Sequence, residues 1–379
     1  MLHFDVDYYD QKESKLFENS VFAKEIGSLV SNGFDVHPLD LLAESMFMER
    51  KNQPNWNNRE DLLSRTVDRF KEFIDYYEIE GKTLVAKFPP QEMENHRIER
   101  VGVGATLCAM GKVLGTTAAD WEKIDIEDKK NLDFQVASTG NDFLVLECKA
   151  SVVEDVTEKT PSISNHKSHI KDKKREQNPQ RPNDSLIGAI AVIPRTDSNS
   201  ARIWLVDPPL PRPFTSARRF KLLARYRFYE RLIRLIGRPY LLIALNTRIY
   251  ALENIENVEV LSGLSLVDMN GEPFGIPASF LNNRSGTVDG SIAGIVKRGT
   301  ERLMFIGIDT SIIYVIAQQS HDSIINWRSG MEGRRQVQID INPRDLEETR
   351  TEINRSNWRS INFDVTVNSS GLVLGIANV

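Results

Sequence analysis

Apolar and polar positions in the middle of the chain follow two different periods. Residues 93–114 have helical spacing and many small side chains, which allow a helix to pack closely against a sheet. Five short β-type runs follow, and one very polar helix, residues 166–177, interrupts them. The expected strands are Trp121–Ile126, Leu132–Ala137, Phe143–Ala150, Leu186–Ile193 and Ile203–Val206. This order predicts an α/β (α+β) fold in which helices flank a mixed sheet.

The pattern changes on both sides of this segment. Residues 1–88 have mainly helical spacing, and after about residue 258 short β-type runs alternate with Gly and Asn turns. We therefore expect a helical N-terminal region (1–88), a central domain (89–257) and a β-rich C-terminal domain (258–379). Further expected elements are helices at Phe17–Val30, Leu41–Phe47, Asp61–Tyr77 and Asp345–Asn354, and strands at Tyr240–Leu245, Arg248–Leu252 and Ile312–Ala317.

Charged residues interrupt two of the apolar strands. Asp133 lies in one strand, and Glu147 and Lys149 occupy alternate positions of the next, so the latter two share a face. Charges in such a strand are costly unless they are paired or bind a metal. Two carboxylates and a lysine that converge can hold Mg²⁺ and position water for phosphodiester cleavage. The alternative is a structural ion pair of Lys149 with Asp133 or Glu147.

The length of the loop between these two strands decides whether the charges meet. A two-residue loop at Gly140-Asn141 would set Asp133 opposite Cys148, on the wrong face. An odd loop, such as residues 139–141, sets Asp133 opposite Glu147. Because a slip of one residue turns every side chain to the other face, the site requires an odd-numbered loop, and we predict one.

The short pattern of an acid, any residue and a lysine is common in this chain, so context has to select among its copies. Only Glu147 follows an unbroken apolar strand and precedes small residues. The other copies start at Asp10, Glu13, Glu49, Glu80, Glu127, Asp128 and Asp172, all in polar or helical settings.

A helix with Glu99, a strand, a strand with Asp133 and a strand with Glu147-Cys148-Lys149 resembles the core of the PD-(D/E)XK (restriction-endonuclease-like) nuclease superfamily over about residues 92–195. The resemblance implies that Asp133 and Glu147 hold a divalent metal, Mg²⁺ or Mn²⁺, and that Lys149 helps to activate water. It implies a supporting role for Glu99 and a metal contact from the backbone carbonyl of Cys148.

Two details of the family pattern extend or qualify this resemblance. Many members carry a Gln or Lys on the helix after the third strand, and Gln177, Lys173 and Lys174 are the candidates here. Leu132 stands where the named motif has Pro. The nuclease-like domain would then be residues 89–257.

Basic residues gather in the helix expected at residues 215–236, although the net charge of the chain is −5. Nine Lys or Arg residues and the single acid Glu230 lie between Arg212 and Arg238. We predict that this helix and the polar helix before it contact nucleic-acid phosphates. Ion pairs or a solvated face are the alternatives. The predicted contacts are Lys171, Lys174, Gln177, Arg218, Lys221, Arg225, Arg227, Arg231 and Arg234.

The expected function is a metal-dependent endonuclease that acts on DNA, which by analogy with the family suits antiviral defence or a mobile element. An RNA nuclease and a non-catalytic nucleic-acid-binding or assembly protein are the alternatives. Two cysteines in apolar stretches, a start unlike a signal peptide and no apolar run near the ~20 residues that span a bilayer predict a cytoplasmic protein without a membrane contact. A homodimer and a partner protein are left open.

Overall fold

The chain forms two compact units, residues 1–53 with 68–220 and residues 54–67 with 221–379. They are described separately. The computed structural model describes residues 1–20, 22–46, 59–123, 133–137, 143–176, 185–196, 198–206, 216–236, 239–264, 266, 287–288, 291–298, 302–341 and 359–378. Each unit has its own sheet, and the protein is of the mixed α/β class.

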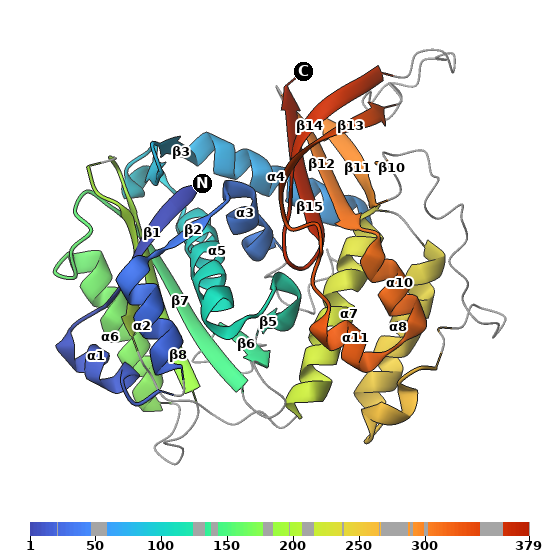
Figure 1. Cartoon of the computed structure of the whole chain (residues 1–379). Helices are drawn as coiled ribbons and strands as arrows, with labels where there is room; N and C mark the ends of the chain where they lie inside the picture. The colour runs from blue at the N-terminus through green and yellow to red at the C-terminus, as the bar shows by residue number, and fades with distance from the viewer. Residues whose placement is uncertain are drawn as a thin grey trace. The chain divides into compact units, whose positions relative to one another are not determined.

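A seven-stranded mixed sheet is the centre of the first unit, in the order β2-β1-β9-β8-β7-β6-β5 (Figure 1). β1 runs parallel to β9 and β7 runs parallel to β8, whereas the other neighbours are antiparallel. The parallel pair β7–β8 needs a crossover, which the helix α6 provides. The strands are β1 (Leu2–Tyr8), β2 (Phe34–Val36), β5 (Trp121–Lys123), β6 (Phe134–Ala137), β7 (Phe143–Val153), β8 (Ser185–Pro194) and β9 (Ala201–Val206).

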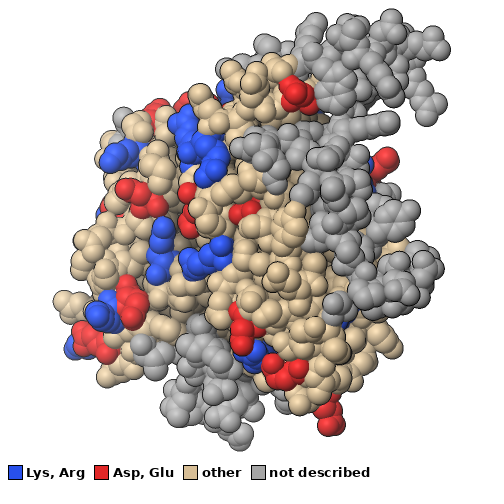
Figure 2. All heavy atoms as spheres, turned by 45° about the vertical axis from the view of Figure 1, so that its right-hand side comes forward, with Lys and Arg blue, Asp and Glu red and all other residues tan. Residues whose placement is uncertain are grey.

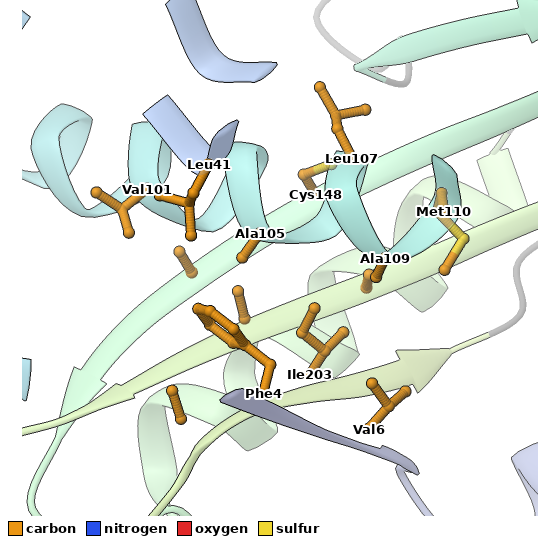
Figure 3. Close-up of a cluster of buried hydrophobic side chains, with 14 of the residues drawn as sticks. Phe4, Val6, Leu41, Val101, Ala105, Leu107, Ala109, Met110, Cys148 and Ile203 are labelled. Carbon is orange, nitrogen blue, oxygen red and sulfur yellow. The ribbon is translucent and has the colours of Figure 1, made fainter. Parts of the chain in front are cut away.

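Helix α5 covers one face of this sheet. In Figure 3, Val101 and Ala105 project from α5 toward the strands, where Phe4, Cys148 and Ile203 lie. All five side chains are buried, so this face forms the larger core of the unit. The helices of the unit are α1 (Gln11–Phe17), α2 (Ala23–Asn32), α3 (Pro38–Met46), α5 (Asn95–Leu114) and α6 (Pro161–Glu176), with the later part of α4 (Arg59–Tyr76) and the hairpin β3 (Tyr77–Glu80)–β4 (Thr83–Ala86).

Two glycines allow α5 to approach its neighbours closely, as the small residues of this segment predicted. A Cβ atom on Gly102 would lie 2.2 Å from the Cβ of Ala150, and one on Gly104 would lie 2.3 Å from the carbonyl oxygen of Leu41. No side chain fits at such distances without movement of the helix or the strand. The absence of a side chain at Gly102 therefore sets the spacing between α5 and β7, and its absence at Gly104 sets the spacing between α5 and α3.

The opposite face of the sheet packs against α6. Ile163 and Ile170 are fully buried against Ile190, Val192 and other side chains of β7, β8 and β9. β7 is consequently buried on both faces, and its side chains alternate between the α5 layer and the α6 layer. The segment that carries Glu147 and Lys149 is thus a central strand.

The second unit contains a six-stranded antiparallel sheet in the order β10-β11-β12-β15-β14-β13. Its inner face is a separate core around Phe305 and Phe363, whose ring centroids are 6.2 Å apart. The elements are α7 (Ala217–Ile236), α8 (Pro239–Asn254), β10 (Thr287–Val288), β11 (Ile292–Arg298), β12 (Arg302–Asp309), α10 (Ser311–Gln318), α11 (His321–Asn326), β13 (Gly333–Ile341), β14 (Arg359–Val367) and β15 (Leu372–Asn378).

Several sequence-based expectations need correction. Residues 239–254 form the helix α8 rather than two strands, and the expected strand at 312–317 is the helix α10. Short apolar runs cannot be assigned to a strand or a helix by their period alone, which explains both errors. Residues 2–8 form β1 inside the first sheet, so residues 1–88 are not a separate helical region.

The boundary between the units also differs from the expected one. It runs through α7, near residue 220, and not near residue 257. The reason lies in the contacts of α7: the hydroxyl groups of Tyr226 and Tyr229 donate to Gln319 and to the carbonyl of Ser370, both in the second unit. The expected helix at 345–354 lies outside the described residues. Among the described helices, none has both the length and the apolar character required to cross a bilayer.

The spacing between α5 and β7 leads to a stability prediction. We expect Gly102→Ala to lower the free energy of unfolding by about 1–3 kcal/mol, because the added methyl group would overlap Ala150. Gly27→Ala in α2 is the matched control, since a Cβ there meets no atom within 4 Å. It should raise stability by about 0.5–1 kcal/mol through helix propensity. Urea unfolding of both variants tests this, and equal effects would contradict the close approach.

Candidate active site

The register between β6 and β7 determines where Asp133 lies. Phe134 pairs with Leu146 and Ala137 pairs with Phe143, so the five residues 138–142 connect the strands. The prediction of an odd-numbered loop is therefore confirmed. Continued by one residue, this register leads to Asp133 opposite Glu147. The ladder itself ends at Phe134 and Leu146, and Asp133 follows as a bend whose backbone N–H donates to the carbonyl of Leu146 at 3.1 Å.

The carboxylate of Asp133 continues the hydrogen bonding of β7 beyond the start of β6. Its Oδ2 atom accepts a hydrogen bond from the backbone N–H of Cys148 at 3.0 Å. Within a strand, the N–H and C=O groups of one residue project to the same side. The carbonyl of Cys148 therefore projects toward the same edge as the carboxylate of Asp133.

Glu147 is the most enclosed charge of the hairpin. Its side chain is fully buried, and its Oε1 atom lies 2.8 Å from Nζ of Lys149 and 2.5 Å from Nζ of Lys173. Its Oε2 atom is also buried but has no hydrogen-bond partner within the described part of the chain. One oxygen of this carboxylate is thus saturated with ammonium groups, while the other lacks a partner.

The electrostatics of the hairpin follow from this geometry. Burial raises the pKa of the Glu147 carboxyl, and the charge of Asp133 raises it further, whereas Lys149 and Lys173 act in the opposite direction. For Lys149, burial alone would lower the pKa, but Glu147 and Asp133 hold it above its ordinary value. The Lys149 side chain consequently keeps its proton, and it is a positive charge and a hydrogen-bond donor rather than a base.

Glu99 lies on the surface of α5 and acts on the same group of charges. Its carboxylate contributes to the raised pKa of Lys149. The contacts of the structure join Glu147 to Lys149 and bring Asp133 to the backbone of Cys148 between them, whereas the exposed Glu99 acts on Lys149 only through its charge.

The oxygen atoms at this site suit a hard divalent cation. The two carboxylates and the carbonyl of Cys148 are the donor type that Mg²⁺ and Mn²⁺ prefer. The buried, unpartnered Oε2 atom of Glu147 fits such a ligand position. No group of three or more His, Cys, Asp or Glu side chains that could hold a metal occurs in the described ranges, so the carbonyl would have to complete this set.

Lys173 is the site residue that the sequence pattern named only as one of three equal candidates. It shared its candidacy with Lys174 and Gln177, whose side chains are outside the described residues, and helix α6 brings it to Glu147. A periodic signal was present: Lys173 follows the buried Ile170 by three residues, as His166 follows the buried Ile163. His166 also contacts β7, because its Nε2 atom lies 2.9 Å from the carbonyl oxygen of Ala150.

Two lysines of α6, Lys171 and Lys167, form ion pairs with residues in and next to α1. Lys171, a predicted phosphate contact, lies 3.1 Å from the buried Oε1 of Glu13. Lys167 pairs with Glu13 and with Asp10, and its ammonium lies 3.9 Å from the ring centroid of Tyr9. This helix is anchored along its first three turns.

The basic helix α7 differs from the predicted phosphate-binding stripe. Arg225 is buried, and its guanidinium donates to the carbonyls of Ile324 and Trp327 at 2.6 and 2.9 Å. Arg227 pairs with Glu253 at 2.6 Å, and Arg234 pairs with Glu230. The structure thus favours ion pairs for Arg227 and Arg234 and hydrogen bonds to backbone carbonyls for Arg225, all within the second unit.

The other predicted contacts of α7 give no exposed stripe either. Arg218, Lys221 and Arg231 are half-buried, and none is free of interactions within the protein. On the face shown in Figure 2, Lys and Arg side chains lie among Asp and Glu side chains and a larger uncharged area. That face is not uniformly basic.

Comparison with protein-family models, with curated proteins and with solved structures gives no match for this chain. Its function has to be argued from the geometry of its own residues.

Arg225 was predicted to contact phosphates, whereas the structure gives it a structural role, and the two roles differ in what loss of this side chain does to stability. We expect Arg225→Met to lower the free energy of unfolding by about 2–4 kcal/mol, because two carbonyls would lose a charged donor in a buried place. Arg335→Met is the matched control, since Arg335 is exposed and donates to one carbonyl, that of Met331. Its effect should stay within about 0.5 kcal/mol. Similar urea midpoints for the two variants would contradict the structural role.

Proposed function

We propose that this chain is a metal-dependent endonuclease that hydrolyses DNA phosphodiester bonds on a restriction-endonuclease-like fold. The observation that carries the proposal is the register of β6 and β7. Continued by one residue beyond Phe134 and Leu146, it leads to Asp133 and Glu147. Glu147 has one oxygen on Lys149 and a second, buried oxygen without a hydrogen-bond partner among the described residues. A strand buried on both faces is a costly place for charges unless they are paired or bind a ligand, and only one oxygen of Glu147 is paired among the described residues.

The order of elements around the hairpin supports the fold. Helix α5 precedes three antiparallel strands, and α6 then crosses over to β8, parallel to β7. This is the arrangement that the resemblance implies for residues 92–195. Helices on both faces keep the central strands dry, which strengthens the interaction of the charges with a phosphate.

Each residue has a role that its surroundings allow. Asp133, Glu147 and the carbonyl of Cys148 would hold the metal ion, which when bound polarises the phosphate and lowers the pKa of water. Lys149 keeps its proton, so its ammonium can orient the attacking water and offset the negative charge that builds up on the phosphate. Glu99, exposed near this ammonium, helps to keep it charged.

One observation favours a second candidate, a non-catalytic nucleic-acid-binding or assembly protein on the same fold. Both lysines contact Glu147 directly, which is the structural ion pair considered as the alternative for this hairpin. In such a protein the lysines would neutralise Glu147 permanently, and no metal would be required.

Nicking of supercoiled plasmid in Mg²⁺ or Mn²⁺ distinguishes the two candidates. We expect Lys149→Ala and the isosteric Glu147→Gln to reduce the nicking rate by at least about 100-fold, because the first removes the ammonium that orients the water and the second removes a charged metal ligand. Lys82→Ala is the matched control. It removes the lysine of another acid-x-Lys copy, Glu80-Gly81-Lys82, which is exposed in the turn between β3 and β4.

The controls separate loss of chemistry from loss of folding. Circular dichroism should give the same spectrum for the wild type and all three variants, and Lys82→Ala should nick at the wild-type rate. RNA of matched sequence, digested in parallel, identifies an RNA nuclease. If the wild type and Lys149→Ala behave alike on both DNA and RNA, the enzyme proposal fails and the non-catalytic protein is favoured.

A further inference from the structure

Lys173 reaches Glu147 from a different element than Lys149 does. Lys149 is two residues from Glu147 on the same strand. Lys173 lies near the end of α6, the helix that follows β7 in the chain after a short loop. Both ammonium groups contact the same atom, Oε1 of Glu147, at 2.8 and 2.5 Å. The shorter contact is the one between the two elements.

A count of formal charges shows that Lys173 completes the neutralisation of the two carboxylates. Asp133 and Glu147 contribute two negative charges, and Lys149 and Lys173 contribute two positive charges, so these four side chains are neutral together. A divalent cation added to this group would leave it with an excess of two positive charges. An ammonium on one oxygen of a carboxylate and a metal ion on the other repel each other strongly in a buried site.

The two lysines differ in how easily they can leave. The backbone of Lys149 is fixed inside a strand that pairs with β8. Among the described contacts of α6, those of Ile163, His166 and Ile170 with the sheet and that of Lys171 with Glu13 come before Lys173 in the chain. The side chain of Lys173 is also one-fifth exposed, so its flexible stem can carry the ammonium into solvent while the helix stays in place.

We propose that Lys173 is a resident counter-cation of the site: its ammonium neutralises Glu147 when no metal is bound, and a divalent cation at Asp133 and Glu147 displaces it. Lys173 thereby opposes metal binding and sets the concentration of metal at which the site fills. This inference rests on the metal site of the proposed function.

Calorimetric titration of Mn²⁺ into the full chain, without nucleic acid, tests the proposal. We expect Lys173→Gln to bind Mn²⁺ on the order of tenfold more tightly than the wild type, since a competing charge is removed. Lys173→Arg keeps the charge and should bind as the wild type does. Lys171→Gln is the matched control, because it removes another α6 lysine that pairs with a buried glutamate, Glu13, and it should leave the affinity unchanged.

Thermal unfolding supplies a second readout. Without metal, Lys173→Gln should melt at a lower temperature than the wild type, because Glu147 loses one of its two counter-charges. Added Mn²⁺ should raise its melting temperature by more than it raises that of the wild type. Lys171→Gln should also lower the melting temperature without metal, but added Mn²⁺ should raise its melting temperature by no more than it raises that of the wild type.

The outcomes separate this inference from the proposed function. If both the wild type and Lys173→Gln bind Mn²⁺, and the variant binds with equal or lower affinity, Lys173 is not a counter-cation and the nuclease proposal stands. If neither protein binds Mn²⁺, the metal site is refuted, and the nuclease and the displacement fall together.

Discussion

A carboxylate without solvent contact must find its charge balance within the protein, and Glu147 is in this position at the middle of a sheet. Three elements bring charged groups to it. The strand β7 supplies Lys149, helix α6 supplies Lys173, and the register of β6 brings Asp133 to the same edge. A shift of β6 by one residue would remove Asp133 from this group and would also turn Phe134 and Val136 out of the apolar core, so the charges and the apolar side chains favour the same register.

The sequence was informative where local rules decide the structure. The parity of the β6–β7 loop followed from counting residues, because side chains in a strand alternate strictly. The helix α5 and its close approach to β7 followed from spacing and small residues, and Gly102 confirms the physical reason. The expectation of a helical region at residues 1–88 was wrong for β1, although Leu2, Phe4 and Val6 alternate with polar residues as in a strand.

Other features depend on tertiary contacts that a sequence does not display. The run Tyr240–Leu245 is as apolar as a buried strand, and only its packing in α8 decides its helical state. A row of arginines on α7 has the same spacing whether it faces phosphates or, like Arg225, the carbonyls of its own unit. For Lys173 the helical spacing was visible, but its partner on β7 is 26 residues away in the chain.

The position of β1 has a consequence for how the first unit assembles. β1 pairs in parallel with β9, so residues 4–8 meet residues 201–205, almost the full length of the unit later. Such a long loop closure is slow, and the first strand made during synthesis has to wait for nearly the last one. Until then β9 presents an unpaired edge that includes Ile203 and Leu205, a template for association between chains. Shortened versions that begin after residue 8 would carry this exposed edge permanently and are expected to aggregate.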